Sequence, residues 1–88
     1  MKHVADPSFW RCYHDLPEHI QQLADKNFGL LKANPHHLSL HLKKVKGFWS
    51  VRVGWSYRAL GVEQEEHVVW FWIGTHAEYD KLIKSRAN

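Results

Sequence analysis

The stretch FWSVRVGWSYRALGVEQEEHVVWFWI, residues 48–73, decides the fold. Its segments 48–53, 57–62 and 67–73 are rich in β-branched and aromatic residues, which favours three strands. Residues 54–56 and 63–66 are turn-forming and polar, so the strands are expected to form an antiparallel meander. Every residue from Val68 to Ile73 is apolar, and we therefore expect the last strand to be central and covered on both faces.

A first helix is predicted before this meander. Asp6 is a good N-cap, and Pro7 suits the first helical position because its missing N–H has no partner there anyway. The helix is expected to run to about His14 and to project three aromatic side chains from one side: Phe9, Trp10 and Tyr13.

A second helix is predicted from a capping box, in which Asp15 caps and Glu18 reaches back three residues later. The helix ends at Asn34, because the residue before Pro35 avoids helical dihedral angles. Its apolar residues recur at spacings of three and four, which places them on one stripe: Leu16, Ile20, Leu23, Ala24, Phe28 and Leu31.

Two shorter elements complete the prediction. Leu38, Leu40 and Leu42 alternate with polar residues, which predicts a short extended segment leading to the lysine-rich run 43–47. Thr75 and Glu78 form another capping box, which predicts a C-terminal helix. The sequence thus predicts an α+β fold, with an N-terminal helical hairpin packed on a small twisted antiparallel sheet and a short C-terminal helix.

Size and composition narrow the class of protein. The chain has 88 residues, which suits one domain spanning residues 1–88, and its formal net charge is +3. Cys12 is its single cysteine, which favours a reducing compartment. No apolar run approaches the roughly 18 residues of a membrane span, and residues 1–6 lack a signal-peptide core, so we expect a cytoplasmic protein. The mild positive charge permits a polyanionic or acidic partner.

In this order of elements, several segments resemble the RelE/ParE superfamily of toxins from bacterial type II toxin–antitoxin systems. The similar segments are 9–17, 42–47 (LKKVKG), 51–54 followed by 57–60, and 72–74 followed by His76 and Tyr79. Members commonly open with a strand before the helical hairpin, and here residues 2–5 leave room for a short one. Ribonuclease members often carry an arginine where this chain has His76.

The resemblance implies a toxin that inhibits translation as a metal-independent, ribosome-dependent mRNA endoribonuclease. It needs no cofactor, and it uses the ribose 2′-hydroxyl to attack the neighbouring phosphate. Two alternatives stay open: a ParE-like, non-enzymatic poison of DNA gyrase, and a degenerate antitoxin-binding module. Either toxic function implies a cognate antitoxin, an acidic protein that covers the basic surface in a hetero-oligomer.

Four residues are the candidates for catalysis. Arg58 and Arg52 lie on adjacent predicted strands, where two guanidinium forks could converge on one phosphate; the competing interpretation is surface pairing with nearby glutamates. His76, at a helix start where the dipole disfavours an imidazolium, is the candidate base, and Asp80 is placed to orient it. Tyr79 is predicted either to contact a base or to fill the core.

The candidate RNA-binding residues are basic and aromatic: Lys43, Lys44, Lys46, Trp49 and Trp55. Lysines contact phosphates and exposed tryptophans stack on unpaired bases, whereas core packing is the competing role for most tryptophans, Trp70 included. No metal site is predicted, because His37 and His41 would lie too far apart along an extended segment.

Overall fold

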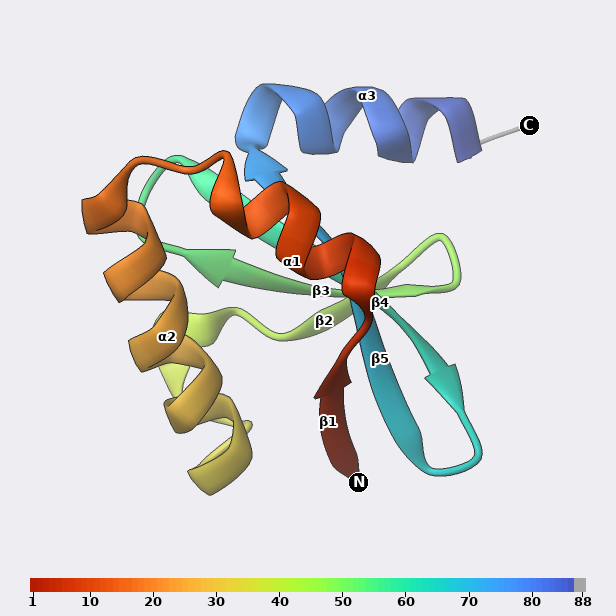
Figure 1. Ribbon diagram of the computed structural model, residues 1–88. Coiled ribbons are helices and arrows are strands. Elements are labelled where there is room, and N and C mark those ends of the chain that lie inside the picture. Colours follow the sequence, from red (N-terminus) through yellow and green to blue (C-terminus); the bar gives the residue numbers. More distant parts are fainter. Residues whose placement is uncertain (87–88) are drawn as a thin grey trace.

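The computed structural model describes residues 1–86, which form a five-stranded sheet with three α-helices (Figure 1). In chain order the elements are β1 (Lys2–Ala5), α1 (Pro7–His14), α2 (Glu18–Ala33), the 3₁₀ helix η1 (Leu38–Leu40), β2 (Lys43–Val45), β3 (Phe48–Val53), β4 (Tyr57–Gln64), β5 (His67–Thr75) and α3 (His76–Arg86). The predicted α+β fold class is confirmed. No helix within residues 1–86 has the length and apolar character needed to cross a membrane.

The sheet has the strand order β1-β5-β4-β3-β2. The meander from β2 to β5 is antiparallel, as predicted. The prediction of an entirely antiparallel sheet is incomplete, because β1 adds a parallel edge strand beside β5. Residues 2–5, where the family resemblance left room for a strand, supply it. A two-residue turn at Glu65 and Glu66 replaces the longer predicted turn, because β4 extends to Gln64.

The first predicted helix is confirmed. The Asp6 carboxylate accepts hydrogen bonds from the Ser8 backbone N–H at 2.9 Å and from the Ser8 hydroxyl at 2.7 Å. These bonds hold the pKa of the Asp6 carboxyl below its ordinary value. The cap therefore fixes where α1 leaves β1.

The second helix forms as predicted, but its predicted capping box is wrong. Asp15 has helical dihedral angles and closes α1, its N–H donating to the Cys12 carbonyl at 3.2 Å. Since Asp15 belongs to the preceding helix, its carboxylate does not cap α2, which starts after Pro17 with no side-chain cap. Gln21 instead holds the connection, with its amide donating to the Tyr13 carbonyl at 3.1 Å.

The leucine alternation after Pro35 also misled the prediction, since Leu38–Leu40 is a 3₁₀ turn and not an extended segment. His37 caps this turn, because its Nδ1 accepts a hydrogen bond from the Ser39 backbone N–H at 3.2 Å. In this turn Leu40 is buried and Leu38 is exposed. The alternation of leucine with polar residues in the sequence therefore fits a 3₁₀ turn as well as a strand. The sheet resumes at the edge strand β2.

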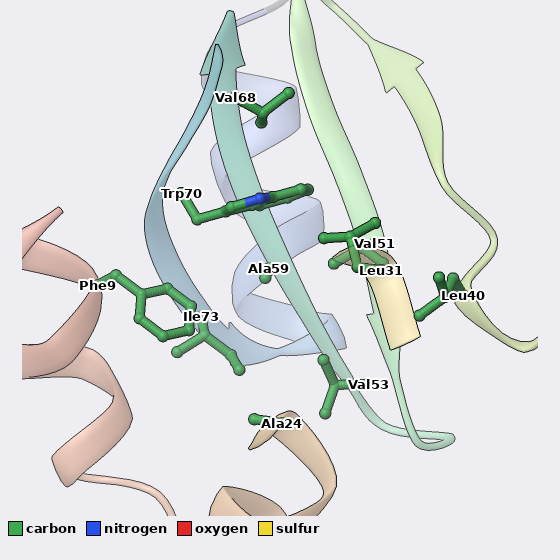
Figure 2. Packing of buried hydrophobic residues seen from close by; sticks show 10 residues of the cluster. All are labelled: Phe9, Ala24, Leu31, Leu40, Val51, Val53, Ala59, Val68, Trp70 and Ile73. Carbon is green, nitrogen blue, oxygen red and sulfur yellow. The ribbon is translucent and has the colours of Figure 1, made fainter. Parts of the chain in front are cut away.

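One face of the sheet forms the hydrophobic core against α1 and α2 (Figure 2). Side chains alternate along a strand, so the residues that share this face follow from the strand register. Val51 pairs with Ala59, and Ala59 pairs with Ile73, which places all three on the face covered by α1 and α2. Figure 2 shows Phe9 of α1 beside Ile73, and Trp70 lying across the core.

The opposite face carries the intervening residues, and α3 packs against the β4 and β5 strands there. The register aligns Ser50 with Leu60, Arg52 with Arg58, and Leu60 with Trp72 on this side. The β5 strand is central, as predicted, because it lies between β1 and β4. It is not fully covered on both faces, since Val69, Phe71 and Trp72 are only partly buried.

Candidate functional site: a buried arginine beside the last helix

Arg58 lies on the α3-covered face of the sheet with only 7% of its surface exposed. Its Nη1 donates a hydrogen bond to the Ser50 hydroxyl of the neighbouring strand at 3.1 Å. Its Nε is buried and has no hydrogen-bond partner, and no carboxylate within residues 1–86 forms an ion pair with it. A buried cation without a counterion is costly, so this guanidinium is held by its surroundings with unused capacity for an anion.

The ring of Tyr79 supports this guanidinium from the α3 side. The Arg58 guanidinium carbon lies 5.2 Å from the centre of the Tyr79 ring, and Tyr79 itself is only 6% exposed. A cation over an aromatic face is attracted by the ring quadrupole, and more strongly where water is excluded. The burial of Tyr79 agrees with its predicted core role, and its contact with an RNA base stays a prediction.

His76 also lies against Tyr79, with ring centres 5.5 Å apart, and its side chain is exposed. Its Nδ1 is 3.2 Å from an Asp80 carboxylate oxygen, one turn along the helix. An Asp80 carboxylate can only accept a hydrogen bond, which favours the tautomer with the proton on Nδ1. That tautomer leaves the Nε2 lone pair open to solvent.

The position of His76 is fixed by backbone bonds and by a helix cap. Its backbone N–H donates to the Ser56 carbonyl in the β3–β4 turn at 2.7 Å. The predicted capping box of α3 is present: the Thr75 N–H donates to the Glu78 carboxylate at 3.0 Å, and the Glu78 N–H donates to the Thr75 hydroxyl oxygen at 3.2 Å. The Thr75 N–H, and after it the Thr75 hydroxyl, donate to the Glu78 carboxylate and keep the pKa of the Glu78 carboxyl below its ordinary value.

Arg52 starts on the same face as Arg58, directly across from it in the register. Its guanidinium carbon, however, lies 5.6 Å from the centre of the Trp55 ring, at the tip of the β3–β4 turn. Trp55 is 91% exposed. Neither arginine pairs with a glutamate among the described residues, contrary to the competing interpretation.

The predicted RNA-binding lysines do not form one cluster. Lys43 and Lys44 are neighbours in a strand, so their side chains leave opposite faces of the sheet, and Lys46 lies in the following turn. Lys44 covers the Trp49 ring at 5.1 Å and pairs with Glu63 at 3.4 Å. The Trp49 indole N–H, and after it the Lys44 ammonium, lower the pKa of the Glu63 carboxyl.

The predicted tryptophans therefore separate by exposure. Trp49 packs partly against the core, and one of its faces is already occupied by Lys44. Trp70 is fully buried, in agreement with its competing core role. Trp55 alone of these three presents its ring to solvent.

The family model of the ParE-like toxin domain matches residues 18–81, which cover α2, the meander and the start of α3. The chain belongs to the ParE-like toxins, within the RelE/ParE superfamily of toxin–antitoxin toxins. The search of curated protein sequences gave no match.

Solved structures share this fold. The toxin is similar to a RelB–RelE antitoxin–toxin complex from Methanococcus jannaschii, with 17% identity, a TM-score of 0.69, and coverage of 90% of this chain and 96% of that one. It is also similar to the RelBE2 toxin–antitoxin complex of Mycobacterium tuberculosis, with 26% identity, a TM-score of 0.63, and coverage of 86% and 91%. A mutant of the Escherichia coli toxin RelE in the free state has 17% identity, a TM-score of 0.65, and coverage of 98% and 92%.

Sequence reasoning about this toxin overlooked Ser50, which holds the Arg58 guanidinium. Ser50 is fully buried and lies between Trp49 and Val51 in a strand of otherwise large side chains. A small hydroxyl residue on the face of the strand that carries arginines was the available signal. Its meaning depends on the strand register, which sequence alone does not fix.

Proposed function

We propose that this toxin is an endoribonuclease that cleaves messenger RNA on the ribosome and thereby inhibits translation. Membership of the RelE/ParE superfamily supports a toxin, and the buried, uncompensated guanidinium of Arg58 carries the enzymatic part of the proposal. A fixed cation that no protein carboxylate neutralises suits a phosphate on which negative charge develops.

In the proposed reaction a ribose 2′-oxygen attacks the adjacent phosphorus, and the bond from phosphorus to the 5′-oxygen breaks. The products are a 2′,3′-cyclic phosphate and a 5′-hydroxyl end, whose proton comes from water. Nε2 of His76 takes the 2′-hydroxyl proton, and Asp80 stabilises the resulting imidazolium through Nδ1. Arg58 neutralises the phosphorane, and Arg52, whose guanidinium lies against Trp55, adds positive charge on the approach to it.

Tyr79 acts in this proposal as a positioning residue. Its ring touches both the Arg58 guanidinium and the His76 imidazole, and it is almost fully buried. It therefore sets the separation of the cation and the base, and its hydroxyl is not required to touch the RNA.

We also propose that a cognate antitoxin binds this toxin. The similar structures from M. jannaschii and M. tuberculosis are antitoxin–toxin complexes. The net charge of +3 suits an acidic partner, and the partly buried aromatic residues of β5 on the α3 side offer apolar surface to it. Within this proposal, action on ribosomes implies a cytoplasmic toxin.

The experiment that tests the proposed function adds the purified toxin to ribosomes programmed with a defined messenger RNA and maps the cut ends by primer extension. The wild type is expected to cut the message, and His76→Gln to cut it about 10²-fold more slowly because the base is lost. His14→Gln, an exposed histidine on α1, is the matched control and should cut at the wild-type rate.

A parallel assay with DNA gyrase separates the alternative. If the wild type leaves the message intact but blocks supercoiling by gyrase, the protein is a gyrase poison and the endoribonuclease proposal is wrong. If His76→Gln cuts as fast as the wild type, the assignment of the base is wrong.

A further inference from the structure

A groove of about 550 Å³ lies between α2, the end of β3 and the β3–β4 turn. The residues that line it are Leu23, Lys26, Asn27, Leu30, His37, Ser39, Arg52, Gly54 and Trp55. We propose that this groove binds an unpaired RNA base and its phosphate, next to the nucleotide that is cleaved. The inference rests on the proposed function and adds a second nucleotide position to it.

The strongest observation is the exposure of Trp55. A tryptophan at the tip of a tight turn, 91% exposed, adds nothing to the core and leaves a large apolar surface in water. One partner of its ring is the Arg52 guanidinium, at 5.6 Å. An exposed indole beside a guanidinium is the arrangement on which unpaired bases stack, because every base has an aromatic face and a phosphate nearby.

The charges in the groove suit a polyanion, and the exposed Trp55 ring at one end favours a nucleic acid, whose bases can stack on it, over an acidic protein segment. Lys26 and Arg52 contribute two cations, and none of the lining residues is a carboxylate. The Asn27 amide donates to the Arg52 carbonyl at 3.0 Å and thereby ties α2 to the rim of the groove. The groove is thus a preformed cationic channel with an aromatic wall at one end.

The groove is joined to the catalytic residues through the β3–β4 turn. Trp55 is followed by Ser56, whose carbonyl accepts the hydrogen bond from the His76 backbone N–H. Arg52 lies across from Arg58 in the register, at an expected Cα separation of about 4.5–5.5 Å. A base stacked on Trp55 would therefore belong to a nucleotide next to the phosphate held by Arg58.

The test measures direct binding of a fluorescein-labelled, ten-nucleotide single-stranded RNA whose riboses are all 2′-O-methylated, so that it cannot be cleaved. Fluorescence anisotropy at low salt should show binding by the wild type and about tenfold weaker binding by Trp55→Ala. Trp55→Phe should keep most of the affinity, because a phenyl ring still stacks. Trp10→Ala, an exposed tryptophan on α1, is the matched control and should bind as the wild type does.

Lys26→Ala gives an independent readout. Loss of one phosphate contact should lower the slope of log affinity against log salt concentration by about 0.7. A duplex of the same sequence should not compete, because its bases are already stacked. Equal binding by Trp55→Ala and the wild type, effective competition by the duplex, or no binding of the single strand by the wild type would each overturn the inference.

The ribosome cleavage assay keeps the two proposals apart. If the wild type cleaves the message but its RNA binding does not depend on Trp55, the endoribonuclease proposal stands and the proposed second nucleotide position is wrong. If RNA binding depends on Trp55 but the message is not cleaved, the groove proposal is supported and the endoribonuclease proposal is wrong.

Discussion

The strands β3, β4 and β5 of the five-stranded sheet present different kinds of buried residue on its two faces. On the face covered by α1 and α2, Val51, Ala59 and Ile73 are buried among apolar side chains. On the face covered by α3, the polar residues Ser50 and Arg58 are also buried, beside the apolar Leu60. The two faces therefore differ in the chemistry of their buried residues, and also in exposure, since Val69 and Trp72 on the α3 side are only partly buried.

This difference follows from the alternation of side chains along a strand. Arg58 and Ala59 are neighbours in β4, but their side chains point to opposite faces of the sheet. Apolar burial on the face covered by α1 and α2 supplies the free energy of folding. The face covered by α3 can therefore hold a buried cation that contributes no such stabilisation. We infer a division of labour between the faces, and substitutions on each face test it.

The largest expected effect comes from Arg58→Met, which replaces the guanidinium by an apolar chain of similar length. Cleavage of ribosome-bound message should fall by about 10²–10³-fold, because a preorganised charge at the phosphate is lost. The free energy of unfolding should stay the same or rise, since an uncompensated buried charge is removed. Urea denaturation, followed by circular dichroism, measures the second quantity.

Arg11→Met, at an exposed arginine on α1, is the matched control for the loss of a positive charge. Its cleavage rate should equal that of the wild type. A strongly destabilised Arg58→Met variant would mean that Arg58 holds the fold together, and the proposed division between the faces would then fail.

An intermediate effect is expected from a pair of neighbouring valines in β5. Val68 is buried on the face covered by α1 and α2, whereas Val69 is partly buried on the face that carries α3. Val68→Ala should lower the free energy of unfolding by about 2–3 kcal/mol, because it removes buried methyl groups and leaves a cavity. Val69→Ala should cost less than about 1 kcal/mol. Equal losses in urea denaturation would show that the two faces contribute alike.

Local patterns in the sequence were sufficient for much of the fold. The Asp6 cap, the apolar stripe of α2 and the Thr75–Glu78 capping box all involve residues within a few positions of one another, and each was predicted. The errors arose where one local pattern fits two structures. Asp15 could start one helix or end another, and the leucines near Leu40 suit both a strand and a 3₁₀ turn.

The candidate site depends more on contacts between distant residues. The types of Arg58 and His76 could be recognised from the sequence, as could the pairing of His76 with Asp80 one turn later. The cation–π contact with Tyr79 and the bond to Ser50 join different elements, and they follow only from the docking of α3 and from the strand register. The catalytic roles themselves stay predictions until the variants are measured.

The smallest expected effect concerns His3, a titratable residue at the edge of the otherwise apolar face. Its Nδ1 accepts a hydrogen bond from the buried Trp70 indole at 3.1 Å, and desolvation by burial lowers the pKa of His3 from its ordinary value of 6.5. The folded state therefore prefers the neutral ring, which alone can accept this bond. The contribution of His3 to stability should be complete above about pH 6.5 and decline as the pH falls below it, because the unfolded chain then binds the proton more readily.

His3→Asn, which keeps an acceptor without titrating, is the comparison, and the urea midpoint of each protein should be measured between pH 7.5 and 5. The urea midpoint of the wild type should fall further on acidification than that of the variant. An equal fall for both proteins would mean that protonation of His3 does not affect the stability of the face covered by α1 and α2.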